Sequence, residues 1–251
     1  MSESVWLLII SLGVMIGGVA IGSWMRDRLP EHHLNEQATG VIKSGLGLIS
    51  TLAALILGLL ISTAKISYDS TASQLSQISS DLILLDQLLS GYGQAGNGAR
   101  EALREQSDAL ANNIWAGAST PRHHVFATSD AWRRFSAAID QLPSTTDQQR
   151  SLRKQIDDVV SRSAQARIRL YSDAGGALPT PFLVLLIFWL GVIFASYSIL
   201  GAINATVMVF VSLFALSSAG SLFLIAELNS PFSGLLKLPR EQISQALAPL
   251  S

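Results

Sequence analysis

The sequence predicts an all-α membrane protein, with four transmembrane helices in two pairs and a helical extramembrane domain between the second helix and the third. Three observations lead to this fold class. Hydrophobic residues make up 49% of the 251 positions and charged residues only 14%, whereas soluble domains carry about 25% charged residues. Four apolar runs have the length of about 20 residues that crosses a bilayer. Between the second and third runs, the composition is that of a soluble domain and apolar residues recur at helical spacing.

The first apolar run, residues 5–24, contains no charged side chain and is followed by the charged residues 26–28. Trp6 and Trp24 stand near its two ends, as is typical of aromatic residues at a membrane interface. Two pairs of glycines within the run have the G-x-x-x-G spacing that lets membrane helices pack closely. These pairs are Gly13 with Gly17 and Gly18 with Gly22. The first helix is therefore expected to pack tightly against a neighbour.

The second run covers residues 44–64, between Lys43 and Lys65. Its helical period continues beyond Lys65 without a helix breaker, through Leu75, Ile78, Leu82, Leu85 and Leu89. This spacing of three and four residues predicts one helix over residues 39–90 that leaves the bilayer and enters the domain. Residues 1–65 are thus assigned to the first two transmembrane helices.

The third and fourth runs follow the domain and fill residues 179–230. Thr180 suits a helix cap and Pro181 the first helical position. The third span is expected to end at Leu200 and the fourth at about Leu228, because Pro231 prevents a helix from continuing.

The domain between the pairs comprises residues 66–178. A glycine-rich turn over residues 91–98 ends the long helix, and further helices are expected over residues 99–115, 129–142 and 146–172. The tail, residues 231–251, contains a short amphipathic helix that either lies on the membrane or docks on the domain.

The second span carries the most informative pattern. Small or polar side chains recur every three or four residues and form one narrow stripe along the helix. The stripe comprises Gly40, Ser44, Gly47, Thr51, Ala54, Gly58, Ser62 and Lys65. One interpretation is close packing between helices, which small residues permit. The other is the wall of a water-filled pore in an oligomer, with a Lys65 cation that attracts anions at the mouth. Lys65 also suits simple snorkelling to the headgroups.

Glu227 is an acidic residue inside the fourth span, and ionisable groups at this depth are costly enough to suggest a function. If its carboxylate faces a lumen, it could bind a cation or relay a proton. The alternative is that Glu227 lies at the interface, where it pairs with Lys237 or Arg240 or is solvated.

Other chemistry is poorly supported by the sequence. Glu31, His32 and His33 form a possible pH-sensing loop, because histidine titrates near neutrality. Neither this triplet nor His123 with its neighbour has the spacing of a metal site, so no metal and no cofactor are expected. The chain has no cysteine and a net charge of −1, which excludes thiol chemistry and gives no basic excess for nucleic acid. No motif typical of an enzyme is present.

Several strings resemble the bacterial bestrophin-like domain family of integral membrane proteins. The resemblance covers nearly the whole chain, and its most specific part is the Leu-Pro-Glu-His-His-Leu string at residues 29–34. Further matching stretches are residues 41–61, 179–184, 188–190, 204–206 and 227–234. The family is itself largely uncharacterised, and its name implies kinship to bestrophins, which are pentameric ion channels with four membrane helices and a helical cytosolic region. In bestrophins the second helix lines the pore and narrows it with bulky apolar residues, including phenylalanine, which the second span here lacks.

Two hypotheses follow. The first is a bestrophin-like homo-oligomeric ion channel, a pentamer by resemblance, in which the second helix lines a pore for inorganic ions. The predicted pore-lining positions are Ser44, Gly47, Thr51, Ala54, Gly58, Ser62 and Lys65. The second is a membrane-anchored scaffold or sensor whose helical domain binds a partner.

We expect a multi-pass protein of the bacterial inner membrane with a cytoplasmic domain. An even number of spans places the amino terminus, the domain and the tail on one side of the bilayer. Near the membrane, that side carries six basic residues against three on the other, which favours the cytoplasm. The six are Lys65, Arg162, Arg167, Arg169, Lys237 and Arg240, and the three are Arg26, Arg28 and Lys43. The charges that flank the first helix favour the reverse orientation.

Overall fold

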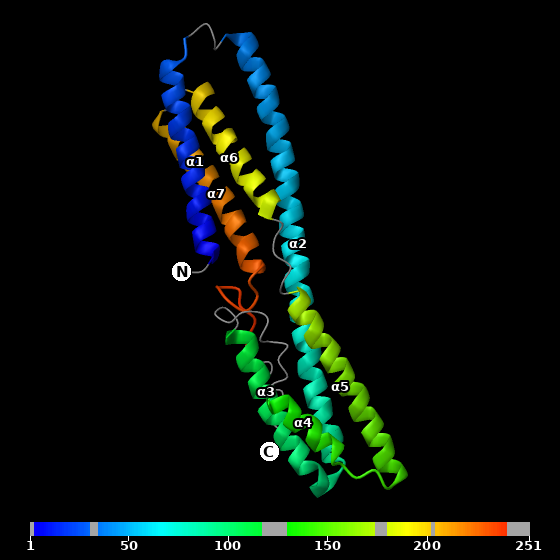
Figure 1. Cartoon of the computed structure of the whole chain (residues 1–251). Helices are drawn as coiled ribbons and strands as arrows, with labels where there is room; N and C mark the ends of the chain where they lie inside the picture. The colour runs from blue at the N-terminus through cyan, green and yellow to red at the C-terminus, as the bar shows by residue number, and fades with distance from the viewer. Residues whose placement is uncertain (1–2, 31–34, 117–129, 174–179, 202–203, 240–251) are drawn as a thin grey trace. The chain divides into compact units, whose positions relative to one another are not determined.

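Helices make up most of the part that the computed structural model describes, which comprises residues 3–30, 35–116, 130–173, 180–201 and 204–239 and contains no strand (Figure 1). In chain order the helices are α1 (Glu3–Arg28), α2 (Glu36–Ser90), the short 3-10 helix η2 (Gly93–Gly96), α3 (Asn97–Ala116), α4 (Asp130–Asp140), α5 (Asp147–Asp173), α6 (Thr180–Leu200) and α7 (Ala205–Leu228). The all-α fold class is therefore confirmed.

Four of these helices, α1, α2, α6 and α7, are long and apolar enough to cross a membrane, as predicted. The long helix predicted over residues 39–90 is present as α2, whose 55 residues begin at Glu36 and end at Ser90. At the start of α7 the Asn204 side chain accepts a hydrogen bond from the backbone N–H of Val207, at 2.9 Å, which is the arrangement of a helix cap.

Two compact units make up the chain. The first comprises Met1–Tyr68 and Ala177–Ser230, and the second comprises Asp69–Gly176 and Pro231–Ser251. Helix α2 contributes residues to both units, because it continues without interruption past Tyr68.

In the first unit, α1 packs against α6 and α7. The contact with α6 depends on Gly18 and Gly22. A Cβ atom at Gly18 would lie 2.5 Å from the carbonyl oxygen of Gly191, and one at Gly22 would lie 2.2 Å from that of Ala195. These glycines therefore let the two backbones approach as the G-x-x-x-G spacing predicts. The first glycine pair, Gly13 and Gly17, does not do so, since a Cβ at either position would meet nothing within 4 Å.

Polar groups continue the contact between α1 and α6 beyond the glycines. The hydroxyls of Ser23 and Ser198 lie 2.7 Å apart and share a hydrogen bond. Arg26 donates from Nη1 to the carbonyl oxygen of Gly201 at the end of α6. The α1–α6 pair is thus held by close backbone approach and by hydrogen bonds at its end.

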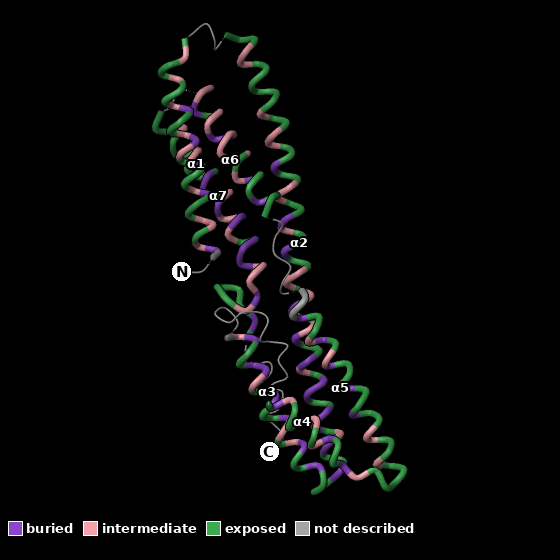
Figure 2. The backbone as a smooth tube through the Cα atoms, viewed as in Figure 1, coloured by how far each residue is buried: buried purple, intermediate pink, exposed green. Residues whose placement is uncertain are grey.

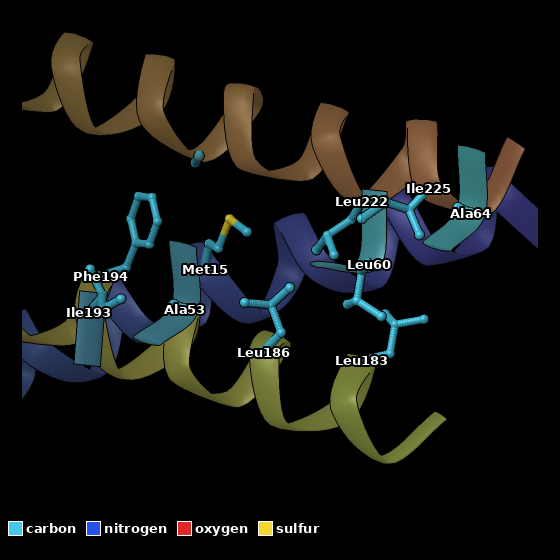
Figure 3. Close-up of a cluster of buried hydrophobic side chains, with 11 residues drawn as sticks. Met15, Ala53, Leu60, Ala64, Leu183, Leu186, Ile193, Phe194, Leu222 and Ile225 are labelled. Carbon is cyan, nitrogen blue, oxygen red and sulfur yellow. The ribbon is translucent and has the colours of Figure 1, made fainter. Parts of the chain in front are cut away.

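Buried apolar side chains from all four helices form the core of the first unit (Figure 3). Met15 of α1, Leu186 of α6 and Leu222 of α7 are at most 1% exposed, and α2 contributes Leu60. The other buried members are Ala53, Ala64, Leu183, Ile193, Phe194, Ala215 and Ile225. Burial of this cluster joins α2 to the α1–α6–α7 bundle through side chains.

The second unit contains the continuation of α2 together with α3, α4 and α5. All five apolar positions that define its period on α2, from Leu75 to Leu89, are buried, as their spacing predicts. In the predicted glycine-rich turn, Gly93 has a φ of +60°, a conformation that favours glycine. The turn is fastened by the Tyr92 hydroxyl, which donates to the carbonyl oxygen of Gln149 at 2.8 Å.

The segment after Pro231 also packs within the second unit. The indole N–H of Trp115 donates to the carbonyl oxygen of Leu238 at 3.1 Å, and its ring makes an edge contact with Phe232 at a centroid distance of 5.7 Å. The predicted amphipathic helix, residues 241–250, lies outside the described residues.

Candidate pore-lining surface

Helix α2 buries only one side of its membrane-spanning part. Ala53, Leu60 and Ala64 are buried in the first unit, and the partly buried Ile56 and Leu57 pack beside them (Figures 2 and 3). Their spacing of three and four residues places them on one helix face. This face attaches α2 to its own bundle.

All seven positions predicted to line a pore are exposed in the single chain. These are Ser44, Gly47, Thr51, Ala54, Gly58, Ser62 and Lys65. At 3.6 residues per turn, their mean direction differs by roughly 140° from that of the buried face. The stripe therefore points away from the helix bundle of its own chain.

The contacts of the stripe residues support this description. A Cβ atom at Gly47 or Gly58 would meet nothing within 4 Å. The Ser44 hydroxyl donates to the carbonyl oxygen of Gly40 at 3.0 Å, and the Thr51 hydroxyl donates to that of Gly47 at 2.9 Å. Because the hydroxyl protons are used within α2, these side chains present acceptor oxygens outward.

A second exposed face of α2 consists of large apolar side chains. It comprises Val41, Leu48, Leu52, Leu55 and Leu59. In the sequence, these residues look like the buried leucines of the same helix. Both kinds are apolar in a membrane protein, so hydropathy alone cannot show which side faces the bundle.

Lys65 closes the stripe and is exposed, beside the buried Ala64. It lies three residues after Ser62, close to one helical turn, so the two side chains share the stripe face.

Glu227 lies in the last turn of α7 and is only 1% exposed. The Glu227 side chain is thus shielded from solvent by its own chain. The preceding residues Ile225 and Ala226 are buried too, so the end of α7 is covered on more than one side.

The possible pH-sensing loop of Glu31, His32 and His33 lies outside the described residues, as does His123. Within the ranges that the structure describes, no group of three or more potential metal ligands comes together.

Two buried aspartates of α2 in the second unit were not predicted as special positions. Asp86, which is 1% exposed, receives two hydrogen bonds from Arg100 of α3, at 2.9 and 2.7 Å. Asp81 accepts from the Gln77 amide at 3.0 Å and lies 3.7 Å from the Nε atom of Arg162 on α5. Both aspartates are adjacent in the sequence to positions of the apolar period, and this was the available signal for their burial.

Comparison with known proteins assigns the chain to a family. The sequence profile of the Bestrophin-like domain matches residues 13–243. The chain belongs to the bestrophin-like domain family. The resemblance of the sequence to this family is thereby confirmed, and the protein is a bestrophin-like membrane protein with four apolar helices long enough to span a bilayer.

Solved structures share the bestrophin-like fold. One substituted form of a bacterial bestrophin homologue from Klebsiella pneumoniae is 16% identical, covers 99% of this chain and 97% of its own, and superposes with a TM-score of 0.67. A second form is 14% identical, with coverages of 98% and 97% and a TM-score of 0.66. A structure described as a membrane protein gives 15% identity, coverages of 98% and 96% and a TM-score of 0.63. No curated protein matches the chain significantly.

Proposed function

We propose that this bestrophin-like protein forms a homo-oligomeric ion channel, in which α2 of each copy lines a central pore for inorganic ions. The observation that carries the proposal is the exposure of all seven stripe positions on the side of α2 away from its own bundle. Membership of the bestrophin-like family supports it, since the kinship implied by the family name is to ion channels.

The exposure of the stripe matters because it excludes close packing of these small residues within their own chain. Where a glycine serves packing within this chain, a neighbour fills the space of the missing side chain, as Ala195 does at Gly22. Gly47 and Gly58 have no such neighbour. The hydroxyls of Ser44, Thr51 and Ser62 would face hydrocarbon if lipid covered the stripe, whereas a ring of copies would give them water.

The proposal extends to the parts of the chain around the pore. Lys65 stands at the domain-side mouth, where a ring of cations would raise the local concentration of anions. Glu227 is an intramembrane acidic group that could bind a cation or carry a proton. The loop of Glu31, His32 and His33 is the candidate pH sensor. Kinship to bestrophins suggests five subunits, and the excess of basic residues on one side suggests an inner-membrane location with a cytoplasmic second unit.

The direct test is ion flux through purified oligomers in liposomes. We expect current from the wild-type protein and a shift of the reversal potential toward cations for Lys65→Glu, because the substitution reverses every charge of the ring. Lys154→Glu is the matched control, since it makes the same charge change at an exposed position of α5. Well-folded oligomers that pass no current would contradict the channel and favour a membrane-anchored scaffold.

A further inference from the structure

Among the exposed residues of α2 in the first unit, three sets of side chains lie side by side around the helix. Their order around the helix axis follows from 3.6 residues per turn. The Gly edge comprises Gly40, Gly47, Ala54 and Gly58. The hydroxyl line comprises Ser44, Thr51 and Ser62. The Leu face comprises Val41, Leu48, Leu52, Leu55 and Leu59. The hydroxyl line runs between the other two, and the buried face completes the circle.

We propose that the Leu face of each α2 packs into the Gly edge of the next copy's α2, so that the hydroxyl line faces the pore between Ser44 and Ser62. The inference rests on the proposed oligomer and names its subunit contact. It assigns the glycine and alanine positions of the stripe to the flank of the pore wall, where two copies meet.

The shapes of the two faces are complementary. Leu55 and Leu59 project from the helix and are 70% and 60% exposed. On the Gly edge, a Cβ atom at Gly47 or Gly58 would meet only open space within 4 Å. Side chains of one helix pack into the hollows of another when helices associate in a membrane, and glycine provides the deepest hollow.

Two glycines of α1 show how close packing against a glycine looks within this chain. At Gly18 and Gly22 the backbone of α6 fills the space of the missing side chain. On α2, Gly47, Ala54 and Gly58 lie on one flank of the hydroxyl line, and the leucines lie on the other. A heterologous contact between copies needs two different surfaces, and the two flanks of α2 provide them.

The angle between the two faces fits a closed ring. From 3.6 residues per turn, the mean directions of the Gly edge and the Leu face differ by roughly 105°. In a ring of identical helices, the directions from one helix to its two neighbours form an angle. This angle is about 90° for four copies, 108° for five and 120° for six. The two faces therefore point toward successive neighbours of a small closed ring, with the hydroxyl line toward its axis.

Disulfide crosslinking can test this contact directly, because the chain contains no cysteine of its own. Four positions provide both the test and its controls. The mixed pairs Gly58→Cys with Leu59→Cys, and Ala54→Cys with Leu55→Cys, place one thiol on each face. The same-face pairs Leu55→Cys with Leu59→Cys, and Ala54→Cys with Gly58→Cys, use the same four residues in the other combination. After mild oxidation of the full-length protein in liposomes, we expect covalent ladders from the mixed pairs only.

Equal crosslinking of the same-face pairs, or no ladder from any pair, would overturn the inference. The variants that assemble can also be assayed for current. Mixed-pair ladders without current would defeat the channel and leave the contact intact. Current without mixed-pair ladders would defeat the contact alone.

A second measurement does not depend on thiol geometry. Gly58→Leu fills the hollow, so we expect it to shift the protein from oligomer to monomer in size-exclusion chromatography with light scattering. Gly13→Leu is the matched control, because a Cβ at Gly13 likewise meets nothing within 4 Å but lies on α1. Oligomers of Gly58→Leu as stable as those of Gly13→Leu would contradict the proposed contact.

Discussion

Substitution of Gly22 by alanine should weaken the contact between α1 and α6. The new Cβ would lie 2.2 Å from the carbonyl oxygen of Ala195 and 2.9 Å from the Cβ of Ser198. A relaxed carbon–oxygen contact is about 3.3 Å, so the helices must separate by about 1 Å. The clashing oxygen belongs to the backbone, and no change of rotamer can relieve it.

The free-energy cost can be estimated from three contributions. Overpacking costs up to about 3 kcal/mol. Separation of the helices also lengthens the hydrogen bond between Ser23 and Ser198, which a membrane interior makes worth about 0.6 kcal/mol. Alanine stabilises the helix by about 1 kcal/mol relative to glycine, because its helix propensity is higher. The net destabilisation is therefore about 2–3 kcal/mol, which corresponds to a fall in Tm of roughly 5–10 °C for a chain of this size.

Thermal unfolding in detergent, followed by tryptophan fluorescence, measures this effect. Gly13→Ala is the control, because its Cβ enters open space and only the propensity gain of about 1 kcal/mol remains. We expect the Tm of Gly22→Ala to fall and that of Gly13→Ala to rise slightly. If both variants unfold at the same temperature, close approach at Gly22 does not hold the two helices together.

Two further predictions concern the second unit. Arg100→Ala leaves the buried Asp86 carboxylate without its bidentate partner and should lower the free energy of unfolding by about 3–5 kcal/mol. Arg100→Met combined with Asp86→Leu removes both charges and should lower it far less. An equal loss of Tm in both variants would contradict this prediction. Tyr92→Phe removes the hydrogen bond to Gln149 and should cost about 1 kcal/mol at neutral pH. Burial raises the pKa of the Tyr92 hydroxyl above its ordinary value of 10.0, so the neutral phenol is favoured in the folded state and stability is lost as the pH rises through that raised pKa. The free energy of unfolding, measured between pH 9 and 11, should therefore fall more steeply with pH for the wild type than for Tyr92→Phe.

Helix positions could be predicted closely because the signals are local. The glycine-rich turn and the regular period from Leu75 to Leu89 indicate where α2 ends and how far it continues. The long α2 followed from the absence of any breaker after Lys65.

Which side of each membrane helix faces its own bundle could not be predicted. Lipid and protein core are both apolar, so Leu55, which is exposed, and Leu60, which is buried, look alike in the sequence. The same limit applies to glycine, since Gly17 and Gly18 belong to equivalent motifs and only Gly18 meets α6. The partner helix decides between them, and it lies far away in the sequence.

The pairing of α1 with α6 has a consequence for biosynthesis. Ser23 and Ser198, which share a hydrogen bond, are 175 residues apart. At translation rates of about 5–20 residues per second, the ribosome needs roughly 10–35 s to produce the second partner after the first. During that interval the first segment lacks the α6 backbone that fills the space at Gly18 and Gly22 in the folded protein.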